Sequence, residues 1–215
     1  MIKENLEKIK QQLPAKVQLV VVSKLRSLKQ LQEVYDEGCR EFAENRVQEL
    51  ILKHEQLPKD IHWHLIGHLQ TNKVKYIAPF VSLIHSVDSF ELAEEINKHA
   101  FKNNRIIPIL LQFHIAQEDS KFGLNPNEAI AVCDKIGALS NVAVQGIMGM
   151  ATFTEDESTI RKEFKQLKSL FDSLKKKCFS DKQTFNTLSM GMSSDYAIAV
   201  LEGSNLVRIG SLVFE

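Results

Sequence analysis

A lysine follows directly on a run of aliphatic residues near the start of the sequence. Residues 17–22 read Val-Gln-Leu-Val-Val-Val, and Ser23 and Lys24 come next. A run this short predicts a strand buried on both faces, as in parallel sheets. Lys24 would then lie just beyond the carboxyl end of a strand, where α/β sheets and barrels place their reactive groups. Taken alone, a lysine in this position is more often an ordinary surface side chain.

Two segments near the carboxyl end of the chain have the composition of an anion site. Residues 189–193 read Ser-Met-Gly-Met-Ser and lead into a helix predicted to begin at Ser193, where free backbone N–H groups attract anions. Residues 208–211 read Arg-Ile-Gly-Ser and supply a fixed cation, a glycine and a hydroxyl. Each segment alone has a structural explanation, in which Ser193 caps its helix and Arg208 pairs with a carboxylate such as Asp195. Because they follow the last two predicted strands, together they favour a phosphate site.

A lysine amine opposite a phosphate site indicates a particular kind of ligand. A lysine that is desolvated or close to a cation has a lowered pKa and attacks carbonyl groups. A ligand with an aldehyde and a phosphate on one planar ring would engage both Lys24 and the phosphate site. Pyridoxal 5′-phosphate (PLP) is such a molecule.

Three histidines that lie close together in the sequence invite comparison with a zinc site. His62 and His64 share one face of a predicted strand, but His68 lies beyond Gly67 and no Asp, Glu or Cys completes a plausible set. We therefore predict no metal. We expect one of His62 and His64 to be a core histidine that is hydrogen-bonded to backbone.

Composition narrows the class of protein. The 215 residues are 44% hydrophobic and 25% charged, with a formal net charge of +0 at pH 7, which argues against a dedicated nucleic-acid-binding protein. No apolar run is long enough to cross a bilayer, and the charged amino terminus lacks a hydrophobic signal core. The three cysteines are widely spaced and include no Cys-x-x-Cys pair, which favours reduced thiols in a cytoplasmic protein. We expect one domain over residues 1–215.

Eight apolar segments alternate with amphipathic ones along the chain. The segments predicted as strands are residues 17–22, 41–45, 63–67, 81–86, 106–113, 142–148, 184–188 and 205–209. Helices are predicted between them; Ser27 and Ser89 are expected N-caps, and Thr154 and Glu157 are expected to form a capping box for the longest helix. A polar loop is expected after the fifth strand, up to Gly123. This alternation predicts an α/β fold with a parallel sheet, and the count of eight strands predicts a single closed (β/α)8 barrel of the TIM type.

Seven short motifs, in order along the chain, resemble those of a known family. They are Val-Val-Ser-Lys (21–24), Phe-Ala-Glu-Asn (42–45), Trp-His-Leu-Ile-Gly-His-Leu-Gln-Thr-Asn-Lys (63–73), His-Ser-Val-Asp (85–88), Gly-Ile-Met-Gly-Met (146–150), Leu-Ser-Met-Gly-Met-Ser (188–193) and Val-Arg-Ile-Gly-Ser (207–211). Over nearly its whole length the sequence resembles the pyridoxal phosphate homeostasis proteins, which are single-domain relatives of the alanine racemase barrel. The resemblance implies an alanine racemase N-terminal-domain-like barrel that binds PLP.

The resemblance also implies roles for individual residues. Lys24 would hold PLP as a Schiff base, Asn45 would lie near the ring, and Arg208 would lie near the pyridine nitrogen or the phosphate. The residues implied around the phosphate are Ser189, Met192, Ser193, Gly210 and Ser211. An arginine facing the pyridine nitrogen would disfavour protonation of that nitrogen, and so weaken the electron-withdrawing chemistry on which most PLP enzymes depend.

Three positions depart from the pattern of the family that the sequence resembles. Ala43 stands where the family usually has glycine, so the backbone there would approach a ligand less closely. Ser211 replaces the usual threonine and keeps its hydroxyl. The chain ends at Glu215, where relatives continue, so we expect less packing on the phosphate side.

Two functions are compatible with these expectations. The first is a cytoplasmic carrier that binds PLP, limits the free aldehyde and delivers it to PLP-dependent apoenzymes. Such a carrier would have no catalytic residues and no nucleic-acid or membrane partners, and we expect it to be a monomer. The alternative is an amino-acid racemase or decarboxylase. Racemases of this fold use a second base, commonly a tyrosine, supplied with an additional β-domain, whereas Tyr35, Tyr76 and Tyr196 all lie away from predicted strand ends. We therefore favour the carrier.

Overall fold

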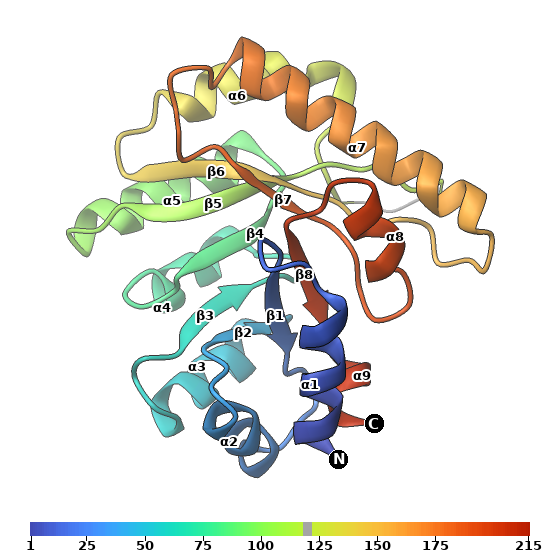
Figure 1. The fold of residues 1–215 in the computed structure, drawn as a ribbon. Helices are drawn as coiled ribbons and strands as arrows, with labels where there is room; N and C mark the ends of the chain where they lie inside the picture. Colours follow the sequence, from blue (N-terminus) through green and yellow to red (C-terminus); the bar gives the residue numbers. More distant parts are fainter. Residues whose placement is uncertain (118–121) are drawn as a thin grey trace.

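The strands close into one parallel barrel in the order of the sequence. In the computed structural model, which describes residues 1–117 and 122–215, β1 pairs with β2 on one side and with β8 on the other (Figure 1). The strands are β1 Gln18–Val22, β2 Glu41–Glu44, β3 His62–Leu65, β4 Leu83–Val87, β5 Ile107–Gln112, β6 Val142–Met148, β7 Thr187–Ser189 and β8 Leu206–Ile209. The predicted (β/α)8 barrel is confirmed. Part of the polar loop expected before Gly123 lies outside the described residues.

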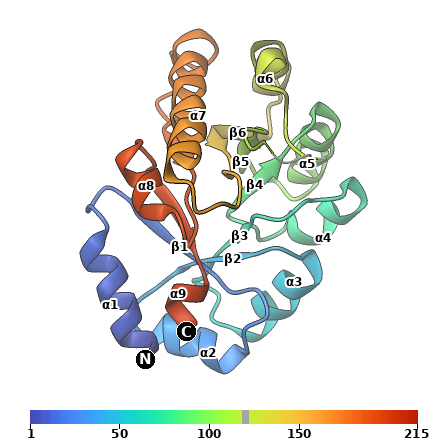
Figure 2. The ribbon, with the colours of Figure 1, turned by 90° about the vertical axis from the view of Figure 1, so that its right-hand side faces the viewer.

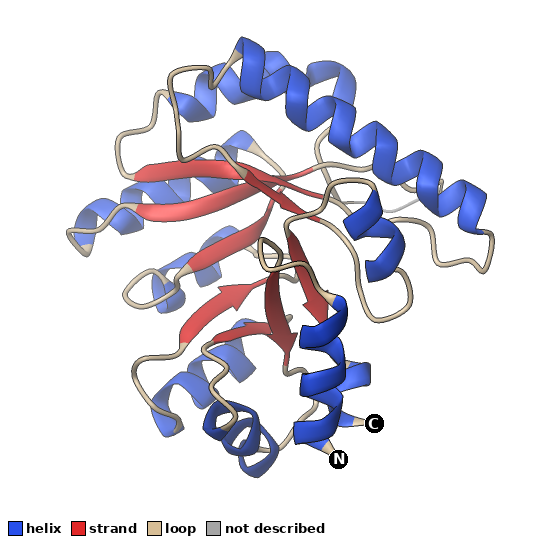
Figure 3. Cartoon of the chain, viewed as in Figure 1, coloured by secondary structure: helices blue, strands red, loops and turns tan. Residues whose placement is uncertain are grey.

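Helices surround the strands (Figures 2 and 3). They are α1 Ile2–Gln12, α2 Leu28–Asp36, α3 Val47–Gln56, α4 Val74–Ile77, α5 Phe90–Lys102, α6 Ala129–Gly137, α7 Glu157–Lys177, α8 Tyr196–Leu201 and α9 Ser211–Phe214, with 3-10 turns at Thr71–Lys73 and Pro126–Glu128. Figure 2 shows α1 between α8 and α2, where it takes the place of a full helix after β8. Within the described residues, no helix is long and apolar enough to cross a membrane.

The first residues of the helices agree only partly with the N-caps predicted from the sequence. Ser27 caps α2 as expected, because its hydroxyl accepts the Gln30 N–H. The predicted capping box of Thr154 and Glu157 is wrong: α7 begins at Glu157, and its N-cap is Asp156, whose carboxylate accepts the Ser158 N–H at 3.0 Å. A carboxylate with neighbouring hydroxyls satisfies the first N–H groups better than the earlier threonine does, and these hydrogen bonds lower the pKa of Asp156 to about 2.

The seventh strand is shorter than its sequence pattern predicts. The pattern covers residues 184–188, but β7 covers only Thr187–Ser189. Phe185 is fully buried and stacks on Phe171 of α7 and on Phe179, with ring centroids 5.2 and 4.4 Å apart. Its ring therefore anchors the turn before β7 to the helical layer, and its hydrophobicity does not mark a strand.

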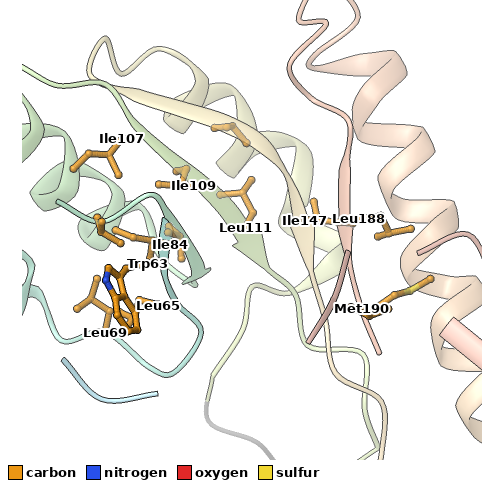
Figure 4. Packing of buried hydrophobic residues seen from close by; sticks show 14 of the residues in the cluster. Trp63, Leu65, Leu69, Ile84, Ile107, Ile109, Leu111, Ile147, Leu188 and Met190 are labelled. Atoms are coloured by element: carbon orange, nitrogen blue, oxygen red, sulfur yellow. The ribbon is translucent and has the colours of Figure 1, made fainter. Parts of the chain in front are cut away.

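The two faces of the strands pack into different layers. Outward side chains meet the helices in a large apolar layer, and Figure 4 labels several of them, including Ile84, Ile109, Leu111, Ile147 and Leu188. Inward side chains form a smaller cluster of Val20, Val22, Ala43, Leu83, Leu110, Met148 and Leu206. Because side chains alternate across a strand, Arg208 faces inward with Leu206, and Lys24 follows the end of β1, whose inward side chains include Val20 and Val22.

Candidate cofactor site at the carboxyl ends of the strands

The barrel brings the predicted site residues to neighbouring strand ends. β7, β8, β1 and β2 are consecutive around the barrel. The Gly210 N–H after β8 donates to the Ser193 hydroxyl after β7 at 3.3 Å, which joins the two glycine-containing segments. A Cβ added to Gly210 would lie 3.0 Å from the Val22 carbonyl oxygen, so this segment also lies against the end of β1. Lys24 and the predicted phosphate loops therefore belong to one rim.

Lys24 has a free amine on a fixed backbone. Its side chain is exposed and makes no hydrogen bond or ion pair with any described residue. The preceding residue, Ser23, is fully buried: its N–H donates to the Ala43 carbonyl at 2.9 Å, and its hydroxyl donates to Glu44 Oε1 at 2.6 Å. Lys53 of α3 donates to the Ser23 carbonyl at 2.8 Å. The peptide that carries Lys24 is thus held from behind while the amine remains available.

Lys53 and Glu44 form a buried ion pair that sequence reasoning missed. Their Nζ and Oε1 atoms are 2.5 Å apart, and the Lys53 side chain is 5% exposed. Burial raises the pKa of Glu44, against hydrogen bonds from Lys53 and Ser23 that lower it, and Glu44 Oε2 is buried without a partner in the described structure. The signal in the sequence is a charge at position 53 on the same helical face as Val47 and Leu50.

The segments after β7 and β8 form a loop pair with free backbone donors. The N–H groups of Ser193, Ser194 and Ser211 have no acceptor among the described residues. Gly191 has a φ of +98°, and a Cβ there would lie 2.6 Å from the Ala199 Cβ, so only glycine fits this turn. The helix predicted to begin at Ser193 instead begins at Tyr196. The structure therefore replaces the expected helix start with a turn in which the N–H groups of Ser193 and Ser194 are free.

Arg208 is fixed inside the barrel. Its side chain is buried, with Nη1 donating to the Ser189 hydroxyl at 2.5 Å and Nη2 donating to the Gly149 carbonyl at 3.2 Å. Burial lowers its pKa to about 10, so the guanidinium stays charged at neutral pH. Within the described part of the chain, no ion pair joins it to Asp195, whose carboxylate accepts the Met192 N–H at 2.6 Å. The alternative explanation of Arg208 as the partner of Asp195 is therefore not realised.

Ser189 and the histidines of the central strands are hydrogen-bonded to one another. Ser189 lies between Arg208 and His85, whose Nδ1 is 3.1 Å from the serine oxygen. His85 Nε2 is 2.9 Å from His64 Nδ1, and His64 Nε2 is 2.8 Å from Glu41 Oε2. The expectation of a histidine bonded to backbone is thus wrong for His64, because both of its ring nitrogens meet side chains. Sequence reasoning missed His85 and Glu41, although a polar residue within an apolar strand marks His85.

The remaining predicted residue, Asn45, follows β2 beside Lys24. Its side chain is exposed and bonds to no described residue. A Cβ on Gly67 would lie 2.2 Å from the Asn45 carbonyl oxygen, so the loops after β2 and β3 touch through a position that only glycine can fill. Among the described residues, no group of three or more His, Cys, Asp or Glu side chains could hold a metal ion.

The sequence and its curated relatives identify the family. Residues 1–215 match the profile of the alanine racemase N-terminal domain. The chain is 40% identical over 185 residues to the pyridoxal phosphate homeostasis protein of Aquifex aeolicus, covering 86% of this chain and 80% of that protein. It is 38% identical over 204 residues to the protein of the same name from Helicobacter pylori strain J99, covering 93% of this chain and 87% of the relative.

Solved structures agree with this placement. PipY of Synechococcus elongatus PCC7942, determined without PLP, superposes with a TM-score of 0.95 at 34% identity over 100% of both chains. The same protein with PLP bound superposes with a TM-score of 0.91. An alanine racemase of Clostridium difficile 630 matches at 16% identity with a TM-score of 0.82, over 99% of this chain and 59% of the racemase, which shows the shared fold alone. The chain belongs to the pyridoxal phosphate homeostasis protein family, on the barrel of the alanine racemase N-terminal domain.

Proposed function

We propose that this protein binds PLP at the carboxyl ends of its barrel strands and serves in PLP homeostasis by carrying and buffering the cofactor. The observation that carries the proposal is the free Lys24 amine beside loops with unpaired N–H groups at Ser193, Ser194 and Ser211. An amine and an anion site on one rim match the aldehyde and phosphate of PLP. The presence of PLP in a PipY structure supports the same ligand.

Each residue of the site has a proposed role. When bound, PLP supplies an aldehyde that condenses with an amine, and Lys24 is the residue that would hold it covalently. Asn45 would lie beside the ring. The residues that would surround the phosphate are Met192, Ser193, Gly210 and Ser211. The Ser189 hydroxyl is already engaged by Arg208 and His85, so its proposed part in the site is to hold the guanidinium in place.

The site fits a carrier better than an amino-acid racemase. The fixed charge of Arg208 would disfavour protonation of a nearby pyridine nitrogen of PLP. Most PLP enzymes use this protonated nitrogen to stabilise negative charge. The hydroxyl of Tyr35 bonds to Asp60 at 2.8 Å, that of Tyr196 bonds to Gln12, and Tyr76 lies exposed on α4. Each of the three tyrosines of the chain thus lies in the helical layer, and none is placed to serve as a second base.

The proposal is tested by locating the covalent bond. Purified protein incubated with PLP should develop an absorbance band of a lysine imine, and borohydride should fix the cofactor on the peptide that contains Lys24. Lys24→Ala should lose the band, because Lys24 is the residue proposed to form the covalent bond. Lys29→Ala, at an exposed lysine of α2, is the matched control and should keep it. A band that persists in Lys24→Ala would assign the imine to another lysine and refute the site.

The carrier function is tested separately from binding. Loaded protein, which we propose acts as a monomer, should transfer PLP to an apo PLP-enzyme and restore that enzyme's activity without consuming amino acids. Catalysis requires interactions specific to a transition state, beyond those that bind a ligand. Racemisation, decarboxylation or transamination at about 1–1000 per second, lost in Lys24→Ala, would overturn the carrier in favour of an enzyme.

A further inference from the structure

A row of hydrogen-bonded side chains crosses the interior of the barrel from one end to the other. It runs from Arg208 through Ser189, His85 and His64 to Glu41, with contacts of 2.5, 3.1, 2.9 and 2.8 Å. Ser189 is the last residue of β7, whereas Glu41 is the first residue of β2. In a barrel of parallel strands these are opposite ends, so the row connects the proposed cofactor site with the far mouth.

The charge on Glu41 decides where the protons of the row lie. Although burial opposes ionisation, hydrogen bonds from His64 and His62 hold the pKa of Glu41 below its usual value. A carboxylate can only accept, so His64 must carry its proton on Nε2. In a neutral ring, His64 Nδ1 is then an acceptor, and the facing Nε2 of His85 must carry the proton.

The tautomer of His85 fixes the orientation of the Ser189 hydroxyl next to the Arg208 guanidinium. With its proton on Nε2, His85 offers Nδ1 as an acceptor to the hydroxyl of Ser189. The hydroxyl donates its one proton there, and its lone pairs face Arg208, which can only donate. If the row ran the other way, the Ser189 hydroxyl would accept from both His85 and Arg208, and its own proton would have no acceptor among the described residues. Only one direction of the row is therefore compatible with the observed position of Arg208.

Because the row is buried, reversing its donors and acceptors would cost free energy. His64, His85, Ser189 and Arg208 are all buried, and each is hydrogen-bonded to its neighbours in the row. A buried polar group without a partner costs about 1–3 kcal/mol. Burial, together with the positive charge of Arg208, keeps the pKa of His85 well below its usual value, so the ring is neutral and has one proton to place. The far carboxylate thus sets which nitrogen receives it.

We propose that Glu41 is a positioning residue for the cofactor site, on which it acts from the far end of the barrel. By fixing the tautomers of His64 and His85, it fixes the orientation of Ser189 and Arg208. The effect of Glu41 on PLP binding rests on the proposed function, because Arg208 is expected beside PLP. The charged and titratable groups that bear on the row are Glu41 and the exposed His62 at the far mouth, His64 and His85 within the barrel, and Arg208 with Asp195 near the site.

The test uses Glu41→Gln, which keeps the size of the side chain but can donate as well as accept. Nitrogen-15 NMR of the histidine side chains, recorded on the protein without ligand, reports the tautomers directly. Wild-type His64 and His85 should both carry the proton on Nε2. In the variant, Nδ1–H should appear at His85, and the Arg208 guanidinium protons should exchange faster with solvent. Glu95→Gln is the matched control, because Glu95 also pairs with a histidine, His99 at 2.9 Å, but on α5 outside the row.

A second measurement follows the effect to the site. Glu41→Gln should lower the affinity for PLP about tenfold, the equivalent of about one hydrogen bond, while Glu95→Gln leaves it unchanged. Nδ1–H at His85 in the wild type would overturn the proposal even if the variant failed to fold. Unchanged tautomers in Glu41→Gln, or altered tautomers with unaltered Arg208 exchange and PLP affinity, would also overturn it. Absence of PLP binding in the wild type would instead refute the proposed function, and tautomers and Arg208 exchange would still decide the role of Glu41.

Discussion

The two cations of the proposed site are held in opposite ways. The amine of Lys24 is exposed and unbonded, and what is fixed is the peptide before it, held by Lys53 and Glu44 between the strands and the helices. Arg208 is itself buried, and its guanidinium is fixed by hydrogen bonds inside the barrel. A group that forms and breaks a covalent bond needs a free side chain on a rigid backbone. A group that sets the electrostatics of a site needs a rigid side chain.

The largest effect should come from the buried pair behind Lys24. Lys53→Met leaves Glu44 buried without its cation, and breaking a buried pair in this way typically costs about 3–5 kcal/mol of folding free energy. Urea denaturation measures the loss. Glu44→Gln combined with Lys53→Met should recover part of it, because the uncompensated charge is gone. A loss no larger than that of Lys59→Met, at an exposed lysine, would mean that the pair does not brace the rim.

The contrast between the two cations predicts that substituting Arg208 lowers stability, whereas substituting Lys24 abolishes PLP binding without changing stability. Arg208→Lys loses the forked contact with Ser189 and Gly149 and should destabilise the fold by about 1.5–3 kcal/mol, the value of a hydrogen bond to a charged group. Lys24→Ala should leave the free energy of unfolding unchanged yet abolish covalent PLP binding. Thermal and urea unfolding of both variants provide the comparison. Equal destabilisation by the two substitutions would remove the distinction between a fixed and a free cation.

The loop pair should show a smaller but graded effect. Gly210→Val places a branched side chain against Val22, whose carbonyl oxygen would be 3.0 Å from the new Cβ, and it should weaken PLP binding more than Ser211→Ala does. Ser211→Ala removes one hydrogen bond to a charged group, about 1.5–3 kcal/mol at most. Titration of PLP against each variant ranks them. Negligible losses in both would place the phosphate elsewhere on the rim.

The smallest effect should come from His85 in the interior row, which should make the folding stability sensitive to acid. The pKa of His85 is depressed in the folded protein, so below about 6.5 the unfolded chain binds more protons than the folded one. Stability should therefore fall as the pH drops below about 6.5 and level off above it. His85→Gln, which cannot titrate there, should flatten this slope. Unfolding curves between pH 5 and 8 measure it, and an identical slope in the variant would show that other groups cause it.

Much of the barrel can be predicted from the sequence because strands buried on both faces leave a local signature. The run before Lys24 is apolar except for Gln18, and β8 is apolar except for Arg208; segments of this kind mark barrel strands. The pattern fails where a buried aromatic has another partner. Phe185 reads as part of a strand but stacks on Phe171 and Phe179, and nothing in its neighbours' sequence indicates that contact.

The sequence by itself determined the fold, the candidate lysine at the end of β1 and the glycine and serine composition of the loops after β7 and β8, because these depend on residues that are adjacent in the chain. Only the tertiary structure decided what Arg208 and Glu44 contact. Ser189 and His85 are 104 positions apart, and Glu44 and Lys53 meet only because α3 packs on β2. The first pairing depends on strand register and barrel closure, which place distant inward-facing residues side by side, and the second depends on helix packing; a local pattern encodes neither.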